Sequence, residues 1–191
     1  MPHEPLYPVF LRLAGLRVVI VGGGAVANGK LDGLFAANAA VTVIAPHIVD
    51  EIRSREGVTL IERAFVPVDL TGARWVIAAA TPEVNREVAA AATARGLFVN
   101  AVDDTRSATA YLGGVVRRGE VEIAISTGGV APALAGLLRE AIDALLPPDL
   151  EAWIAVAIRE RTAWRQQNIP IGERRPLLLR ALARLYQPRS G

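Results

Sequence analysis

The fold is decided by one stretch near the start of the chain, Arg17-Val18-Val19-Ile20-Val21-Gly22-Gly23-Gly24-Ala25-Val26-Ala27. A short apolar run, typical of a buried strand, meets glycines in the pattern G-x-G-x-x-A and continues into a helix-like segment. Gly22 allows a sharp turn, Gly24 leaves no Cβ in the path of a pyrophosphate, and Ala27 lets the helix pack closely on the strand. A purely structural turn fits the bare motif equally well, so the neighbouring segments must decide between the two interpretations.

Short apolar runs and helical segments alternate after this motif, which favours βαβ units. Thr81 is expected to cap a helix that begins at Pro82, a good first helical residue. The segment 6–13 is either an edge strand or an irregular lead-in. Strands are expected at 17–21, 41–45, 58–62, 75–80 and 97–102, and helices at 25–38, 48–55 and 82–95. The sequence therefore predicts an α/β fold with a Rossmann-like, doubly wound parallel sheet.

The pattern changes after Asp103 and Asp104. The residues predict a β-hairpin from strands at 109–117 and 121–126, followed by helices at 131–145, 150–167 and 172–186. Pro147 and Pro148 mark a boundary between the first of these helices and the helical remainder.

Composition excludes several classes of function. With no cysteine among 191 residues, disulfides, thiolate nucleophiles and cysteine metal sites are excluded. His3 and His47 are the only histidines, so no multi-histidine metal site is expected. Because no apolar run is long enough to span a bilayer and no signal-peptide pattern opens the chain, a cytoplasmic protein without a membrane partner is expected.

The charge is unevenly distributed along the chain. Residues 151–191 contain eight arginines and three glutamates, whereas the rest of the chain has more acidic than basic residues. This tail either binds an anionic partner or forms a solvated helix face. Nucleic acid is not expected, because Trp153, Trp164 and Tyr186 form no recognisable stacking platform.

One common feature of dinucleotide-binding sites is missing. An acidic residue about 20 positions after the glycines usually binds the adenine ribose, but here the second strand ends in Ile44-Ala45-Pro46-His47. Backbone groups or His47 would then hold the ribose, although His47 is equally compatible with an exposed loop. These residues alone do not distinguish NAD from NADP.

The whole set of motifs resembles the precorrin-2 dehydrogenase family of sirohaem synthesis, including the N-terminal module of sirohaem synthase. The resemblance covers nearly the whole chain and depends on the order of its parts. They are 21–27 with Lys30, 43–46, 79–81 with Asn85, 100–104, 124–129, 131–135 with 138–140, and 172–175.

The resemblance implies NAD-dependent oxidation of precorrin-2 to sirohydrochlorin by a homodimer. The expected parts are an NAD-binding Rossmann domain (1–113), a dimerisation element (114–148) and a C-terminal helical domain (149–191). Asp103 is the expected catalytic residue, which would accept a proton or stabilise positive charge, and Asp104 is expected to be structural. The alternative is that Asp103 or Asp104 only caps a turn, as adjacent Asp residues commonly do. The expected cofactor residues are Gly22, Gly24, Ala25, Val26, Ala45, Pro46, His47, Ala80, Thr81 and Val102.

The loop before the helix at 131–145 is the expected substrate site. Its hydroxyls and free N–H groups suit a carboxylate of the tetrapyrrole, although a plain helix cap has the same residue types. The expected substrate residues are Ser126, Thr127, Gly128, Gly129 and Arg139. Thr127 matches a regulatory phosphorylated serine of sirohaem synthase, so its modification is an open question.

The sequence departs from the family at the substrate side and at Gly29. Ala110 and Gly113 replace a Phe and a Pro, and Val130 replaces a Lys, so the pocket wall is expected to differ. No histidine follows His47, and little or no ferrochelatase activity is therefore expected. Two other functions stay open: an NAD(P) oxidoreductase acting on another anionic substrate, and a non-catalytic NAD-sensing module.

Overall fold

The computed structural model describes residues 5–187; residues 1–4, which include His3, and 188–191 lie outside the described part. The chain forms two compact units. The first comprises the described part of Met1–Leu112 together with Ser126–Ala131, and the second comprises Gly113–Ile125 with the described part of Pro132–Gly191. The expected three-part division stays a prediction.

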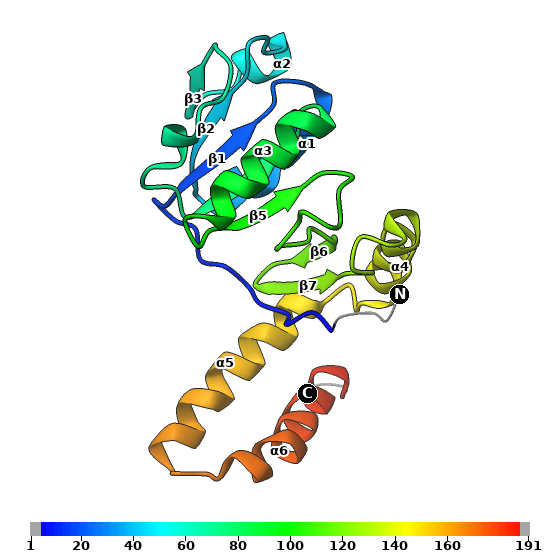
Figure 1. The fold of residues 1–191 in the computed structure, drawn as a ribbon. Helices are drawn as coiled ribbons and strands as arrows, with labels where there is room; N and C mark the ends of the chain where they lie inside the picture. The colour runs from blue at the N-terminus through cyan, green and yellow to red at the C-terminus, as the bar shows by residue number, and fades with distance from the viewer. Residues whose placement is uncertain (1–4, 188–191) are drawn as a thin grey trace. The chain divides into compact units, whose positions relative to one another are not determined.

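A five-stranded sheet forms the centre of the first unit (Figure 1). Every neighbouring pair is parallel, and the strand order is β3-β2-β1-β4-β5. The strands are β1 (Arg17–Val21), β2 (Ala40–Ile44), β3 (Val58–Ile61), β4 (Trp75–Ala78) and β5 (Phe98–Ala101). The predicted Rossmann-like fold is thus confirmed. Because the chain reverses its direction of winding between β3 and β4, the switch point where such sheets bind ligands lies between β1 and β4.

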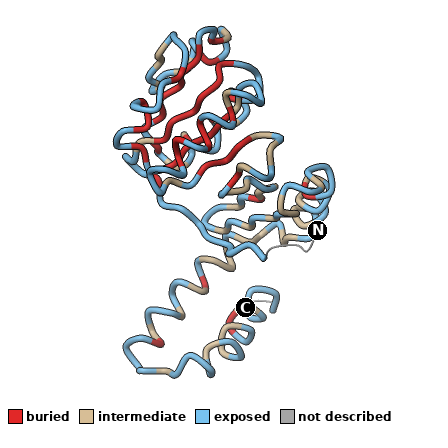
Figure 2. The backbone as a smooth tube through the Cα atoms, viewed as in Figure 1, coloured by how far each residue is buried: buried red, intermediate tan, exposed pale blue. Residues whose placement is uncertain are grey.

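Helices pack on opposite faces of this sheet, as alternation along a strand requires. They are α1 (Ala25–Ala36), α2 (Asp50–Arg53) and α3 (Pro82–Thr93), with a 3₁₀ turn η1 (Pro67–Leu70) before β4. Val18 and Ile20 of β1 share one apolar cluster with Leu31 of α1, whereas Val19 shares the other with Val88 of α3. Figure 2 shows these strands as the most continuously buried part of the tube. The β1–α1 turn is therefore anchored by buried apolar side chains on both faces of the sheet.

Two segments near the sheet need comment. Residues 6–13 contain no strand, and only Leu13 of this segment is buried, so the irregular lead-in is the correct one of the two alternatives. The first hairpin strand begins at Gly114 and not at residue 109. Thr109 instead covers the free edge of β5: its N–H donates to the Val99 carbonyl, and its Oγ1 accepts from the Val99 N–H, both at 2.9 Å. Because Thr109 bonds to backbone groups of Val99 on the edge strand β5, it is not available to pair within the hairpin.

The second unit combines a hairpin with helices. Strands β6 (Gly114–Arg118) and β7 (Val121–Ile125) are antiparallel, and α4 (Pro132–Leu145) packs on β6. A Cβ on Gly114 would lie 2.9 Å from the Ala135 carbonyl oxygen, so only glycine allows this close approach. α5 (Leu150–Gln166), α6 (Ile171–Ala183) and the 3₁₀ turn η2 (Arg184–Tyr186) follow. Among residues 5–187, no helix is both long and apolar enough to cross a bilayer.

A buried carboxylate stabilises the crossover from β3 to β4. Asp69 is buried and accepts hydrogen bonds from the Arg63 guanidinium at 2.8 Å and from the Val66 N–H at 2.9 Å. These donors, Arg63 above all, hold the pKa of Asp69 below its ordinary value. Since the folded state lowers this pKa, the stabilisation is fully present above the unfolded pKa, near pH 4, and is lost as the pH falls through the folded pKa.

Replacing Asp69 by asparagine is therefore expected to lower the free energy of unfolding at neutral pH by about 1–3 kcal/mol, the usual effect of disrupting a buried hydrogen-bonded polar group. Urea titrations at neutral pH and at successively lower pH should show the native and variant curves converging once the pH falls below about 4. The matched control is Glu62→Gln. It breaks the exposed Arg53–Glu62 pair and should change stability little. A pH-independent difference for Asp69→Asn would contradict this account.

Candidate functional site: the carboxyl edge of the parallel sheet

The β1–α1 turn fits its neighbours only because it consists of glycine. Gly22 has φ +130°, and a Cβ there would lie 2.1 Å from the carbonyl oxygen of Ala79, just after β4. A Cβ on Gly23 would lie 2.2 Å from the carbonyl oxygen of His47. Around Gly24, by contrast, a Cβ would meet no atom within 4 Å. The first two glycines thus serve packing within the protein, and Gly24 faces open space.

The start of α1 is arranged to receive an anion. Gly24 occupies the N-cap position without a side-chain cap, and the first intrahelical bond runs from the Asn28 N–H to the Gly24 carbonyl at 3.0 Å. The preceding amides, those of Ala25, Val26 and Ala27, belong to the first turn, where N–H groups have no intrahelical acceptor. Together with the helix dipole they suit a pyrophosphate. The space around Gly24 leaves the approach to this helix start free of protein atoms.

The loop after β2 is tied to this turn. The Gly22 N–H donates to the Ile44 carbonyl, and the Val49 N–H donates to the Gly23 carbonyl, both at 2.9 Å. Ala45 is buried, whereas Pro46 and His47 are exposed. The structure therefore brings the expected ribose-binding residues beside the glycines. The exposed imidazole of His47 fits both a role at the ribose and a plain surface position.

The ends of β4 and β5 complete this edge. The Ala79 N–H donates to the Val21 carbonyl at 2.7 Å, and the Val102 N–H donates to the Ala78 carbonyl at 2.9 Å. Ala80 and Thr81 are exposed. Thr81 occupies the N-cap position of α3, but its side chain makes no capping hydrogen bond, contrary to the expectation for a cap. The Thr81 side chain instead bonds the Glu83 carboxylate in the first turn of α3, and this bond, after the one from the Glu83 backbone N–H, lowers the pKa of Glu83.

Asn85 is a residue to which the sequence reasoning gave no role. Its side chain is buried; Oδ1 accepts from the Ala80 N–H at 2.9 Å, and Nδ2 donates to the Val102 carbonyl at 3.3 Å. Asn85 thus links the exits of β4 and β5, by which we mean the residues that directly follow each strand. The signal was present in the sequence, because Asn85 lies three residues before Val88 and so shares the apolar stripe of α3, where a polar side chain requires partners.

Asp103 and Asp104 occupy different environments in the turn after β5. Asp104 accepts from the amides of Arg106 and Ser107 at 3.1 and 3.2 Å, and bonds to Ser107 are the main cause that lowers its pKa. Asp103 has an exposed side chain and a backbone in the left-handed region, at φ +58°. The turn-capping role therefore falls to Asp104. A catalytic role for Asp103 stays a prediction.

The loop Ser126–Ala131 packs on the same unit as this turn. A Cβ on Gly129, which has φ +77°, would lie 2.8 Å from Cγ2 of Thr105 and 3.4 Å from the ring of Tyr111. The Tyr111 hydroxyl in turn donates to the Thr105 carbonyl at 2.9 Å. Gly129 thus seats the expected substrate loop on the segment that follows Asp103. The sequence reasoning missed Tyr111, for which no motif gives a signal.

The free amides expected in this loop are partly occupied. Ser126 Oγ accepts from the Gly128 N–H, Thr127 Oγ1 accepts from the Ala131 N–H, and the Thr127 carbonyl accepts from the Val130 N–H. The expectation of free N–H groups is therefore wrong for these three amides, because the loop satisfies them itself. Each hydroxyl still has its own proton to donate, so the loop can bind a carboxylate through the hydroxyl groups of Ser126 and Thr127.

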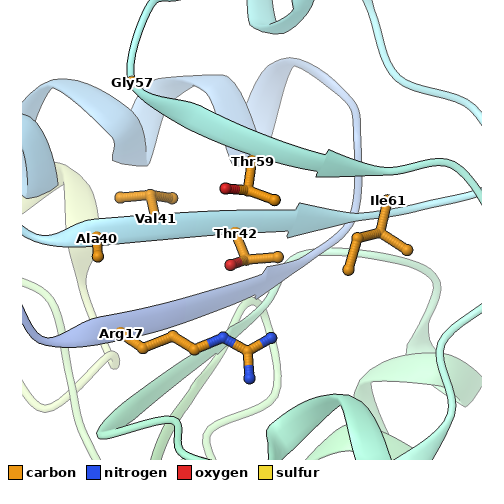
Figure 3. A pocket seen from close by; sticks show the side chains of 7 residues that line it. All are labelled: Arg17, Ala40, Val41, Thr42, Gly57, Thr59 and Ile61. Carbon is orange, nitrogen blue, oxygen red and sulfur yellow. The ribbon is translucent and has the colours of Figure 1, made fainter.

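Two further features involve none of the loops described above. Arg139, on α4 of the second unit, contacts Glu140 at 3.1 Å. A hollow on the β1–β3 part of the sheet (Figure 3) contains none of the expected site residues; it is lined by Arg17, Ala40, Val41, Thr42, Gly57, Thr59 and Ile61. Among the described residues, no three acidic or histidine side chains gather as metal ligands would.

A doubly wound sheet with a glycine turn, an uncapped helix start and small exposed residues along its carboxyl edge defines a nucleotide-binding protein of the Rossmann class. The comparisons agree. Residues 9–114 match the family described as "Putative NAD(P)-binding", and residues 118–145 match "Sirohaem biosynthesis protein central". The chain belongs to the first of these families, and it carries the second match directly after it.

Curated relatives support the expected resemblance to sirohaem synthases. The chain is 39% identical over 175 residues to siroheme synthase 3 of Aeromonas hydrophila subsp. hydrophila, with 88% of this chain and 37% of the relative covered. It is 41% identical over 177 residues to the siroheme synthase of Gluconacetobacter diazotrophicus, with 88% and 38% covered. The chain thus spans little more than a third of these relatives.

A solved structure confirms the fold. The structure described as "SirC, precorrin-2 dehydrogenase" aligns with a TM-score of 0.68 at 22% sequence identity, covering 92% of this chain and 88% of that one. Its arrangement of a parallel sheet, hairpin and C-terminal helices is the one observed here.

Proposed function

We propose that the protein is an NAD-dependent dehydrogenase that oxidises precorrin-2 to sirohydrochlorin. The observation that carries the proposal is the carboxyl edge of the sheet, where an open helix start and the turn of Asp103 occur together. The relatives named as sirohaem synthases and the fold shared with a precorrin-2 dehydrogenase support this choice of substrate.

The cofactor would lie across the ends of β1, β4 and β5. The amides of Ala25 and Val26 would bind its pyrophosphate, and the loop 45–47 would hold the adenosine ribose. Bound NAD supplies an acceptor for the hydride removed from the substrate. NAD is preferred over NADP on the basis of the family resemblance. The arginines that follow β2 also support it, because Arg53 pairs with Glu62 and Arg55 with Asp32, which leaves them engaged within the protein.

The chain's own residues would bind the substrate and take up its proton. Dehydrogenation removes a hydride and a proton from the macrocycle, and the exposed carboxylate of Asp103 would accept that proton. Hydroxyl groups of Ser126 and Thr127 would bind a carboxylate of the tetrapyrrole. Arg139 of the second unit stays a predicted substrate residue. Asp104 holds the turn through the amides of Arg106 and Ser107.

The test is anaerobic incubation of the purified chain with precorrin-2 and NAD. The proposal expects reduced nicotinamide and the absorption of sirohydrochlorin to appear together, in equal amounts. Binding of NAD without either product would favour a sensing module. Oxidation of a different carboxylated substrate, with precorrin-2 unchanged, would favour the second enzymatic alternative.

We further propose that the protein is a homodimer, joined through the element around α4. This amphipathic helix buries Ala135, while its apolar residues Leu134, Leu137 and Leu145 are exposed by 48%, 62% and 82%. With Leu138, which is exposed by 39%, four leucines of this helix face solvent, a costly surface for a monomer. The family resemblance independently implies a dimer.

Replacing Leu137 by glutamate is expected to weaken the dimer. One buried leucine contributes about 1.5–3 kcal/mol, so the dissociation constant should rise about tenfold or more. Sedimentation velocity over a concentration series measures the change. Ile171→Glu is the control: Ile171 is 81% exposed but lies on α6. A native chain that stays monomeric throughout, or equal weakening by both variants, would contradict the proposal.

A further inference from the structure

We propose that Asn85 is a positioning residue that couples the cofactor loop after β4 to the catalytic turn after β5. This inference rests on the proposed function. The inference extends that function, because it assigns the link between the cofactor loop and the catalytic turn to one buried amide, that of Asn85.

Asn85 is buried and forms a hydrogen bond to each of the two strand exits. The residue is 3% exposed and lies at the start of α3, directly behind the carboxyl edge of the sheet. Its two polar atoms bind two different strand exits: Oδ1 accepts from the Ala80 N–H, and Nδ2 donates to the Val102 carbonyl. Ala80 belongs to the expected cofactor loop, and Val102 immediately precedes Asp103. Neither exit can shift without breaking a hydrogen bond in a buried setting, which is costly.

The next residue shows why such a support is needed. Asp103, which follows Val102 directly, has φ +58°, a left-handed conformation that is uncommon outside glycine, although Asp and Asn adopt it more readily than other residues. On one side its turn is held by Asp104 through two amides. On the other side the Val102 N–H donates to the Ala78 carbonyl and the Val102 carbonyl accepts from Asn85, so both backbone polar groups of the preceding residue are fixed. Asn85 therefore sets where the Asp103 carboxylate lies relative to the cofactor loop.

The two bonds of Asn85 have opposite polarity, and this allows them to be separated by mutation. In Asn85→Asp, a carboxylate oxygen still accepts from the Ala80 N–H, but the donor to Val102 is lost and two oxygens then oppose each other. In Asn85→Leu, a side chain of similar size leaves both the Ala80 N–H and the Val102 carbonyl without a partner. The first variant should disturb only the catalytic turn, and the second should disturb both exits.

The experiment compares NAD binding by calorimetry with steady-state oxidation of precorrin-2. For Asn85→Asp we expect an unchanged dissociation constant for NAD and a fall in kcat of about tenfold or more, whereas Asn85→Leu should weaken NAD binding about tenfold as well, the equivalent of one unsatisfied buried group. Asn100→Leu is the control for NAD binding. Asn100 is also buried, but its amide donates to the Ala110 carbonyl instead of to the two exits.

The outcomes separate this inference from the function on which it rests. The positioning role would be overturned if Asn85→Asp and Asn85→Leu lost NAD affinity and kcat to the same extent. It would also be overturned if the loss of kcat in each variant equalled the loss of folded protein measured by thermal unfolding. Asn100→Leu weakening NAD binding as much as Asn85→Leu would also overturn it. A native chain that binds no NAD would refute the proposed function, and the inference would fall with it.

Discussion

Gly22→Ala is expected to unfold the nucleotide-binding unit or to lower its free energy of unfolding by about 3 kcal/mol or more, because overpacking and a strained positive φ act together. The added methyl group would meet the Ala79 carbonyl oxygen at 2.1 Å, and this contact is with backbone, which cannot rotate away. To remove the clash, β1 and β4 would have to separate at the point where the Ala79 N–H bonds to Val21 at 2.7 Å. Urea unfolding followed by circular dichroism measures the loss.

Gly24→Ala is the matched control for this prediction. A Cβ at Gly24 would meet no protein atom within 4 Å, and φ there is −98°, which any residue adopts. Stability should therefore change little, while the affinity for NAD falls because the methyl group occupies the approach to the helix start. Unchanged stability in Gly22→Ala would contradict the packing role of Gly22. Unchanged NAD affinity in Gly24→Ala would contradict the location of the pyrophosphate.

The second large effect is expected from Asp103. Replacement by asparagine keeps the size of the side chain and tolerates φ +58°, but it removes the group that accepts the proton. General base catalysis contributes about 10²–10⁴-fold, so NADH formation from precorrin-2 should fall by that factor. Asp103→Ala should abolish turnover, with a further cost from backbone strain. NAD binding should be intact in both variants, because the carboxylate is expected to face the substrate.

Asp104→Ala distinguishes chemistry from turn structure. Asp104 caps two amides, so its loss should lower the stability of the turn, as for other side-chain caps. Asp104→Ala should lower turnover less than Asp103→Asn does, and this smaller loss should be accompanied by a lower free energy of unfolding. Normal turnover in Asp103→Asn, or a larger catalytic loss in Asp104→Ala, would refute the assignment.

The fold was predictable because local patterns and tertiary packing agree in the first unit. The apolar run 17–21, the glycines after it and Pro82 at a first helical position each point to the element that forms. The hairpin start was predicted too early, because Thr109 pairs with β5 through its hydroxyl as well as its N–H. That pairing depends on the end of the sheet being free, which residue types do not reveal.

The site was only partly predictable for a related reason. Residues adjacent to strand ends could be assigned from the topology, since parallel strands present their carboxyl ends together. The role of Gly23 depends on a carbonyl group 24 positions further along the chain, that of His47. The contacts of Asn85 and Tyr111 likewise join segments whose distance in the fold is not encoded in any local pattern. Contacts of this kind require the three-dimensional structure.

The most direct test of the central claim is a titration of the isotope-labelled chain with NAD, followed by amide chemical shifts. The account predicts saturable shifts concentrated at Gly24–Ala27, Ala80–Thr81 and Val102–Asp103, the amides along the carboxyl edge of β1, β4 and β5. Shifts gathered instead around Arg17, Thr42 and Thr59 in the hollow of Figure 3, or no saturable shifts at all, would contradict it.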